Sequence, residues 1–263
     1  IQPSELVKIT IILALAKFYH DIKFENIKKI SFLLFPFFIL IIPFIFVVIQ
    51  PDLGTSLSII ILGVFILFIA GVRIWKFILG LIVTMVSIPV VLQFIKPYQR
   101  DRIVSFLNPE SDPLGQGYQL IQSKIALGSG GATGKGFLEG TQSYLEYLPE
   151  KQTDFIFTLI GEEFGFLGTM FIIFTFVLLI AVCYFISIKC FHTFGRILAL
   201  GVASNVFIYV FMNIAMVSGL MPVVGIPLPL ISYGGSVMLS IMISMGLVLN
   251  VELNYNLKKL HNA

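Results

Sequence analysis

Residues 144–165, YLEYLPEKQTDFIFTLIGEEFG, join the longest polar segment of the chain to a long apolar run. The stretch contains five of the fourteen acidic residues of the chain, and one of them, Asp154, lies where the polar character ends. If the apolar run forms a helix that enters a membrane, Asp154 lies at the boundary between water and lipid. An acidic side chain at that position either caps the start of the helix or belongs to a functional site.

The composition of the whole chain indicates a polytopic membrane protein with an all-α fold. Hydrophobic residues make up 57% of the 263 residues and charged residues 12%, and the mean hydropathy is +0.99. A soluble domain of this size cannot bury so much apolar surface. The net charge of +3 is small and scattered, so no nucleic acid partner is expected. Cys183 and Cys190 would lie about 10 Å apart on one helix, too far for a disulfide.

Seven apolar segments predict a bundle of seven membrane spans in a single integral membrane domain, residues 1–263. The spans are expected at about 4–18, 30–49, 55–72, 74–95, 164–188, 197–218 and 231–251, with a large loop at 96–153. Residues 154–188 would measure about 52 Å as one straight helix, whereas the hydrocarbon core is about 30 Å thick. We therefore expect this helix to break near Gly161, Gly165 or Gly168.

Positive charges are distributed unevenly among the connections between these spans. Residues 17–29, 73–76, 189–196 and the tail hold ten Lys or Arg, whereas residues 50–54 and 219–230 hold none. Connections rich in Lys and Arg stay on the cytoplasmic side. The C-terminus is therefore expected in the cytoplasm, and the large loop with Asp154 is expected outside.

Five segments of the chain resemble one family of membrane proteins. They are QPSELVK (2–8), QPDLGTSL (50–57), NPESDPLGQGYQLIQSKIALGSGG (108–131), GKGFLEGTQSYLEYLPEKQTDFIFTLIGEEFG (134–165) and GLMPVVGIPLPLISYGGS (219–236). In this order they are similar to the SEDS proteins (shape, elongation, division and sporulation), and GTQ before LEYLPE is more similar to RodA than to FtsW. The family normally has ten spans. Because the chain begins at Ile1 and has no Met before Met85, we expect its start to be an internal cut. The resemblance implies that the chain begins at the fourth span, which agrees with the seven spans predicted here.

The resemblance implies a function in the bacterial plasma (inner) membrane. It implies an inverting peptidoglycan glycosyltransferase that polymerises lipid II into glycan strands during cell-wall elongation and so maintains rod shape. The partners that it implies are the substrate lipid II, the membrane lipids and a class B penicillin-binding protein, which is a transpeptidase.

The same resemblance implies that Asp154 is the catalytic residue. A carboxylate near the acceptor sugar can act as general base on its 4-hydroxyl, while undecaprenyl pyrophosphate leaves as a stable anion. Without the resemblance, a helix N-cap formed with Thr153 is slightly favoured. No cofactor is predicted outright, and a divalent cation (Mg²⁺ or Mn²⁺) that bridges Asp154 and the substrate pyrophosphate stays open.

Charged residues outside the acidic stretch are further candidates. Glu5 and Lys8 share one helix face, either as a structural ion pair or as the lining of an outward cavity that supports the site. Arg102 and Lys135 are outward cations that can meet the pyrophosphate or the carboxylates of the substrate. A solvated loop charge is the commoner role for either of them.

Three polar residues complete the predicted substrate site. Gln122 and Ser123 lie in a helical segment of the loop and are candidate sugar contacts. Ser232 opens the last span at the depth of Asp154, and its position in the family pattern favours a substrate contact.

Two other functions suit the same hydropathy pattern. A lipid II flippase also needs broken helices, an intramembrane ion pair and a lipid-sized groove. It would need charges along a path through the membrane, however, whereas the carboxylates here gather at the outer surface. A non-catalytic scaffold for a transpeptidase is the third interpretation, and it predicts that substitutions of Asp154 have no effect.

Overall fold

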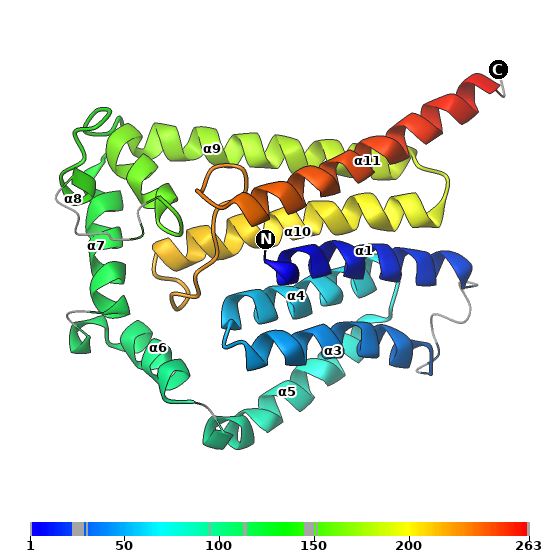
Figure 1. The fold of residues 1–263 in the computed structure, drawn as a ribbon, viewed down its shortest axis with the longest axis horizontal. Coiled ribbons are helices and arrows are strands. Elements are labelled where there is room, and N and C mark those ends of the chain that lie inside the picture. Colours follow the sequence, from blue (N-terminus) through cyan, green and yellow to red (C-terminus); the bar gives the residue numbers. More distant parts are fainter. Residues whose placement is uncertain are drawn as a thin grey trace. The chain divides into compact units, whose positions relative to one another are not determined.

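The computed structural model describes residues 2–22, 29, 31–94, 96–112, 115–144, 150 and 152–261, without the side chains of 90–92, 94, 143–144 and 256–261. Within these residues the chain is helical and contains no strand (Figure 1). The helices are α1 (Pro3–Asp21), η1 (Ser31–Leu33), α3 (Leu34–Ile49), α4 (Leu53–Ile69), α5 (Ile74–Phe94), α6 (Pro97–Leu107), η2 (Pro109–Ser111), α7 (Gln116–Ser129), α8 (Thr141–Tyr144), α9 (Ile156–Lys189), α10 (Thr193–Val217) and α11 (Gly235–His261). The predicted all-α membrane fold is confirmed.

Seven of these helices (α1, α3, α4, α5, α9, α10 and α11) lie where spans are predicted. In the part of the chain that the structure describes, four helical segments are long and apolar enough to cross a membrane: 31–49, 156–189, 193–217 and 235–255. Residues 53–69 and 74–89 form shorter apolar helices. The total of seven spans stays a prediction.

The predicted outer loop, 96–153, is largely helical rather than irregular. Helices α6, α7 and α8 follow one another through it, and α7 contains the stretch for which helical periodicity was expected. Residues 113–114, 145–149 and 151 of the loop lie outside the description.

Helix α9 breaks at Gly165, one of the three glycines at which its length predicts a break. Gly165 adopts φ 65° and ψ −160°, a conformation that glycine alone adopts readily. The break frees backbone groups, and the glycine-rich segment 130–136 binds them. The N–H groups of Phe166 and Leu167 donate to the carbonyls of Gly131 and Ala132 (2.9 and 3.1 Å), and the carbonyls of Glu162 and Glu163 accept from the N–H groups of Lys135 and Gly136 (3.0 and 3.1 Å).

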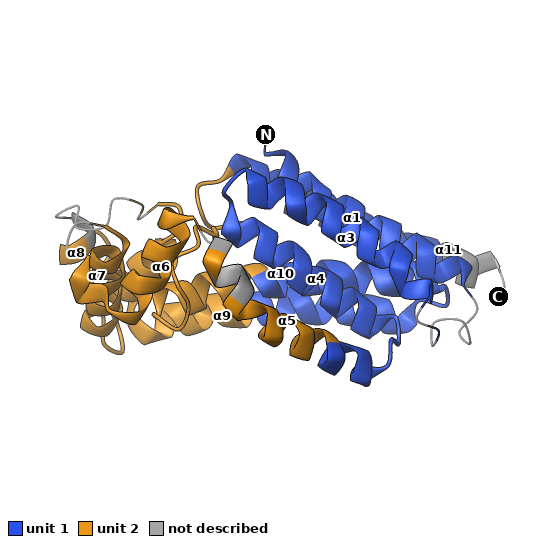
Figure 2. Cartoon of the chain, turned by 90° about the horizontal axis from the view of Figure 1, so that it is seen from below, with its two compact units in different colours: residues 1–79, 176–208, 235–263 blue, residues 80–175, 209–234 orange. Residues whose placement is uncertain are grey.

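The chain divides into two compact units, and the boundaries run through helices α5, α9 and α10 (Figure 2). Unit 1 contains residues 1–79, 176–208 and 235–263, and unit 2 contains residues 80–175 and 209–234. Asp154 belongs to unit 2, whereas Glu5 and Lys8 belong to unit 1. The expectation of a single integral membrane domain stays a prediction.

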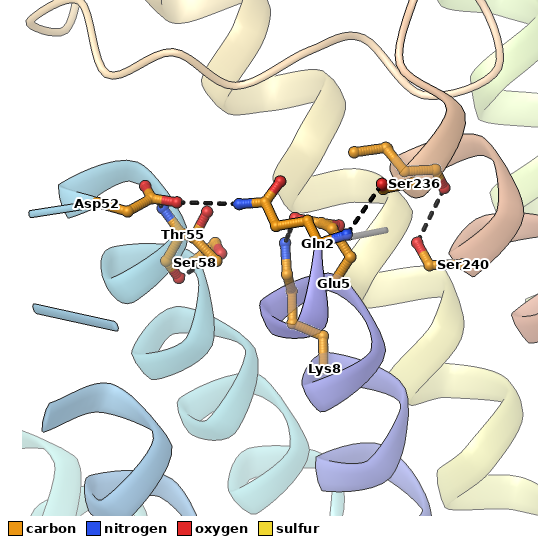
Figure 3. A network of polar contacts seen from close by, with 9 residues as sticks. Gln2, Glu5, Lys8, Asp52, Thr55, Ser58, Ser236 and Ser240 are labelled. Atoms are coloured by element: carbon orange, nitrogen blue, oxygen red, sulfur yellow. Dashed lines mark hydrogen bonds and ion pairs between the residues drawn. The ribbon is translucent and has the colours of Figure 1, made fainter. Parts of the chain in front are cut away.

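Within unit 1, three helices begin at the same end. The side-chain amide of Gln2, before α1, donates to Asp52 Oδ2 at the start of α4 (3.3 Å), and the Gln2 N–H donates to Ser236 Oγ in the first turn of α11 (3.0 Å; Figure 3). Near the far end of α1, the ring of His20 lies 6.3 Å from the ring of His192, which precedes α10. This arrangement agrees with spans that enter from the side predicted to be outside.

Candidate active site

Asp154 lies in a tight turn directly before α9. The N–H groups of Thr153 and Phe155 both donate to the carbonyl of Glu150 (3.2 Å each), and Thr153 Oγ1 donates to the Glu150 carboxylate (2.8 Å). The Asp154 side chain is half-buried, and within the described residues its carboxylate accepts no hydrogen bond. The N-cap interpretation therefore finds no support there, and the carboxylate is left for other chemistry.

The connection between α10 and α11, residues 218–234, is fastened to this turn. Ser232 Oγ donates to the carbonyl of Thr153 (2.7 Å) and accepts the N–H of Leu228 (2.7 Å), and the Tyr233 N–H donates to the carbonyl of Gln152 (2.9 Å). Ser232 thus holds the turn in place; a substrate contact at Ser232 stays a prediction.

A glycine of the same connection lies against the carboxylate. Gly225 has φ +69°, and a Cβ built on it would lie 3.3 Å from Asp154 Oδ2. Larger residues would therefore be strained at this position and would crowd the carboxylate. Glycine at this position keeps the space beside Asp154 open.

Asn213, which the sequence did not single out as a site residue, holds the turn from its other side. It is fully buried in α10, and its Nδ2 donates both to the backbone carbonyl of Asp154 (2.8 Å) and to that of Ile226 (2.7 Å). Its Oδ1 has no hydrogen-bond partner among the described residues. The sequence signal that could have identified Asn213 is its amide inside the apolar run 197–218, because a buried polar group in a span needs a hydrogen-bond partner.

The surroundings of Asp154 stabilise the protonated form of its carboxyl and so raise its pKa. Burial raises the pKa of its carboxyl to about 6, the carboxylate of Glu150 adds to the rise, and the guanidinium of Arg102 opposes it. At neutral pH the group is mostly ionised, and its pKa is close to the pH at which a general base is most effective. Of the predicted cations, the structure thus identifies Arg102 as one that acts electrostatically on Asp154.

Arg102 is carried on α6, which is tied to α7. The carboxylate of Asp112 accepts hydrogen bonds from Ser105 Oγ on α6 (3.0 Å) and from the N–H of Gly117 on α7 (3.3 Å). These bonds, led by that of Gly117, hold the pKa of Asp112 below its usual value. The ionised side chain of Asp112 therefore links α6 to α7.

The two predicted sugar contacts on α7 differ in their surroundings. Ser123 is fully buried, and its hydroxyl bonds Thr158 Oγ1 on α9 (2.7 Å) and the carbonyl of Val217 at the end of α10 (2.8 Å). Gln122 is half-buried and makes no hydrogen bond to the described residues. Ser123 thus joins three helices of unit 2, and sugar contacts at either residue stay predictions.

Lys135 is engaged by the protein itself. Its ammonium lies 2.7 Å from Oε1 of Glu162 and 2.8 Å from Thr141 Oγ1, and the same Glu162 oxygen also accepts the N–H of Gln142 (2.9 Å). Glu162 is fully buried. Lys135 therefore compensates a buried carboxylate beside the break in α9, and its contact with substrate stays a prediction.

Glu5 and Lys8 form a buried ion pair in unit 1. The Lys8 ammonium lies 2.8 Å from Glu5 Oε1, and both side chains are almost inaccessible to solvent. Figure 3 shows the pair on α1 beneath Gln2, close to the start of α4. There Asp52 caps α4 by accepting the N–H of Thr55 (2.9 Å). The pair thus belongs to a polar network at the end of unit 1 that is predicted to lie outside.

In the described part of the chain, no group of three or more His, Cys, Asp or Glu residues is arranged to hold a metal ion. A cation at Asp154 would therefore take most of its ligands from the substrate phosphates and from water, as Mg²⁺ commonly does. Cys183 and Cys190 are both free, as their spacing predicts, and both are buried.

Comparison with known proteins places the chain in one family. The model FTSW_RODA_SPOVE, described as cell cycle protein, matches residues 1–257. The chain is 46% identical over 255 residues to the peptidoglycan glycosyltransferase MrdB of Escherichia coli (strain K12), covering 95% of this chain and 68% of MrdB. It is 41% identical over 254 residues to the stage V sporulation protein E of Bacillus subtilis (strain 168), covering 96% and 68%.

Solved structures share the fold. A chain in a structure described as "Structural coordination of polymerization and crosslinking by a peptidoglycan synthase complex" has a TM-score of 0.80 and 32% identity, over 97% of this chain and 70% of that chain. The Rod shape determining protein RodA of Thermus thermophilus has a TM-score of 0.65 and 24% identity, over 97% and 66%, and this similarity concerns the fold alone. The resemblance of the sequence motifs is confirmed, and the chain belongs to the FtsW, RodA and SpoVE family of cell cycle proteins.

Proposed function

We propose that this protein is a peptidoglycan glycosyltransferase that polymerises lipid II into glycan strands, in cell-wall elongation and the maintenance of rod shape. MrdB of Escherichia coli, which is 46% identical to the chain, is named a peptidoglycan glycosyltransferase, and FtsW of Trichlorobacter lovleyi, which is 41% identical, is named a probable one. The observation that carries the mechanism is the turn at Asp154, which Asn213 and Ser232 hold from two sides while its carboxylate stays without a bonded donor in the described residues.

In the proposed reaction, Asp154 acts as general base. The 4-hydroxyl of the acceptor sugar attacks the anomeric carbon of the donor and forms the new glycosidic bond with inversion. The bond from that carbon to the pyrophosphate oxygen breaks, undecaprenyl pyrophosphate leaves with the electron pair, and Asp154 takes the hydroxyl proton. Because pyrophosphate is a stable anion, charge stabilisation replaces a general acid.

Arg102 is the cation that we assign to the substrate anion. Its charge acts on Asp154, whereas the ammonium of Lys135 is already bound by Glu162. A guanidinium can bind two phosphate oxygens at once and remains charged at every relevant pH. Gln122, Ser123 and Ser232 stay proposed sugar contacts, and Ser232 also holds the turn before α9.

The flippase interpretation is not favoured, since the relatives are named as glycosyltransferases. Substitution of Asp154 distinguishes the scaffold interpretation, which predicts no effect, from catalysis, which predicts a loss of activity. An exchange of its carboxylate for an amide removes the base with little change of shape.

The protein is a membrane protein, and we propose the bacterial inner membrane as its location, with the C-terminus in the cytoplasm and the loop at 96–153 outside. We further propose a class B penicillin-binding protein as its partner. A relative with 32% identity was solved in work on a peptidoglycan synthase complex that couples polymerization to crosslinking, which supports a crosslinking partner.

The proposal is tested with purified protein, labelled lipid II and penicillin to block crosslinking. We expect glycan strands from the unaltered protein and none from Asp154→Asn or Asp154→Ala. Asp101→Asn, an exposed acid on α6, is the matched control and should polymerise normally. Strand synthesis by folded Asp154→Asn at the normal rate would show that the base lies elsewhere, and no synthesis by the unaltered protein would count against the function.

A further inference from the structure

A hollow of about 180 Å³ lies at the end of unit 1 that is predicted to be cytoplasmic. Its walls come from three segments: the connection between α9 and α10, the first turn of α10 and residues 250–255 of α11. Phe191, Phe194 and Tyr255 line it with aromatic rings, and Asn250 and Asn254 add amides. The proposed reaction uses none of these residues.

The hollow is a formed feature of the packing between α10 and α11. A Cβ added to Gly195 would lie 2.6 Å from Cys190 Sγ and 2.8 Å from Val251 Cγ1, so glycine permits this close approach. The rings of Phe191 and Tyr255 lie 5.5 Å apart, although Phe191 itself is 82% exposed. A single water needs about 10–15 Å³ of such space, so the hollow is large enough for a phosphate with part of its glycerol.

The charges around the hollow are basic. Lys189 ends α9 and Arg196 lies in the first turn of α10, and both side chains are exposed. Arg196 Nη2 lies 3.5 Å from the carbonyl of Cys190, which is a wall residue, and His192 lines the hollow directly. Glu252 is the only acid on α11 and is not among the lining residues.

We propose that this hollow binds the phosphate and glycerol region of an anionic phospholipid from the cytoplasmic leaflet. Basic pockets between spans on the cytoplasmic side suit such headgroups, and aromatic side chains are at home at the membrane interface. Arg196, which bonds the carbonyl of the wall residue Cys190, would meet the phosphate, and Lys189, the residue before Cys190, would add positive charge. Phe191, Phe194 and Tyr255 would contact the glycerol and the first methylenes. This proposal does not depend on the glycosyltransferase activity.

The test reads lipid contact directly. Phe191→Trp is made in a Trp75→Phe background, so that the reporter is the only tryptophan of the chain. The purified protein is placed in phosphatidylcholine vesicles, and quenching is compared for brominated phosphatidylglycerol and brominated phosphatidylcholine with identical acyl chains. We expect quenching by phosphatidylglycerol at a roughly thirtyfold lower lipid fraction, in line with two nearby cations.

Two variants test the two parts of the hollow. Lys189→Gln with Arg196→Gln should abolish the preference for phosphatidylglycerol, and Asn254→Phe should weaken binding of both lipids by filling the space. Arg73→Gln with Lys29→Gln removes two exposed cations from the same predicted face, away from the hollow, and should retain the preference. An equal loss in that control would mean general surface attraction and would overturn the proposal, as would the absence of any preference in the reporter protein.

Discussion

Asp154 combines a raised pKa with a position that packing has fixed. Burial supplies the higher pKa, and Asn213 and Ser232 bind the backbone on either side of it rather than its carboxylate. The base is thereby oriented while its oxygens stay available. This arrangement suits a group that must accept a proton from a bound hydroxyl.

The first prediction at this scale concerns pH. A general base works only when ionised, and the pKa of Asp154 in the folded protein is about 6. We expect kcat/KM for lipid II to be constant above that value and to fall about tenfold per pH unit below it. Initial rates of polymerisation between about pH 4.5 and about pH 8 measure this fall. If the rate began to fall only near about pH 4, the pKa of an ordinary aspartate, the result would contradict the burial of Asp154.

A second prediction concerns Asn213. Asn213→Ala leaves two buried carbonyls without their donor, so the free energy of unfolding should fall by about 1–3 kcal/mol. A turn displaced by about 1 Å should lower kcat by up to roughly a hundredfold. The acid limb should also move toward lower pH, because a looser turn exposes Asp154. Asn205→Ala, a buried amide two turns earlier in α10, is the control and should leave the limb in place.

At the scale of elements, the break in α9 links the loop at 96–153 to the apolar part of this helix. The backbone of the glycine-rich segment 130–136 completes the hydrogen bonds that the break leaves open. Lys135 and Glu162 add an ion pair across the same contact. The Lys135–Glu162 ion pair and the backbone hydrogen bonds at the break therefore hold the same two segments together.

Gly165→Ala tests this link. Position 165 has a positive φ, which alanine rarely adopts, and the new Cβ would collide with backbone atoms of Gly134 and Ala132. We expect a loss of several kcal/mol in the free energy of unfolding, since backbone atoms cannot give way as a side chain can. Gly128→Ala is the matched control, because it lies in α7 with open space around it and should be neutral or slightly stabilising. Equal stability of both variants in thermal unfolding would contradict the described break.

The ion pair of α1 allows a test of its two interpretations. Glu5→Gln leaves the buried Lys8 charge poorly compensated, so we expect the free energy of unfolding to fall by about 3–5 kcal/mol. The swap Glu5→Lys with Lys8→Glu should restore much of that loss. Polymerisation assays on the swapped protein then separate the roles: retained activity indicates a structural pair, and lost activity in a stable protein indicates that the pair lines a working cavity.

At the scale of the whole molecule, the remaining question is orientation. The predicted topology places Ser111 outside and Arg73 in the cytoplasm, and both side chains are exposed. We expect Ser111→Cys to react with a membrane-impermeant maleimide in intact cells, and Arg73→Cys to react only after permeabilisation. Both are made without Cys183 and Cys190, which are replaced by Ser. Labelling of Arg73→Cys in intact cells would reverse the assigned topology.

Much of the molecule could be predicted from local sequence. Apolar runs determine where helices enter lipid, because unpaired backbone groups are too costly there. The length of 154–188 against the membrane thickness predicted the break near Gly165, and the motifs indicated the family and Asp154. Inside the loop at 96–153 the sequence did not predict that Ser123 bonds Thr158 and Val217 or that Lys135 pairs with Glu162; contacts of Ser123 and Lys135 with substrate stay predictions.

The sequence by itself determined the membrane class, the helical fold, the family and the candidate acid, since each depends on composition or on residues close together in the chain. Only the tertiary structure decided how that acid is held. Asn213 reaches Asp154 across 59 positions and Ser232 reaches Thr153 across 79, and no local pattern specifies such pairs. The physical reason is that both contacts satisfy backbone carbonyls left open by turns, and which distant donor satisfies them depends on how the helices pack.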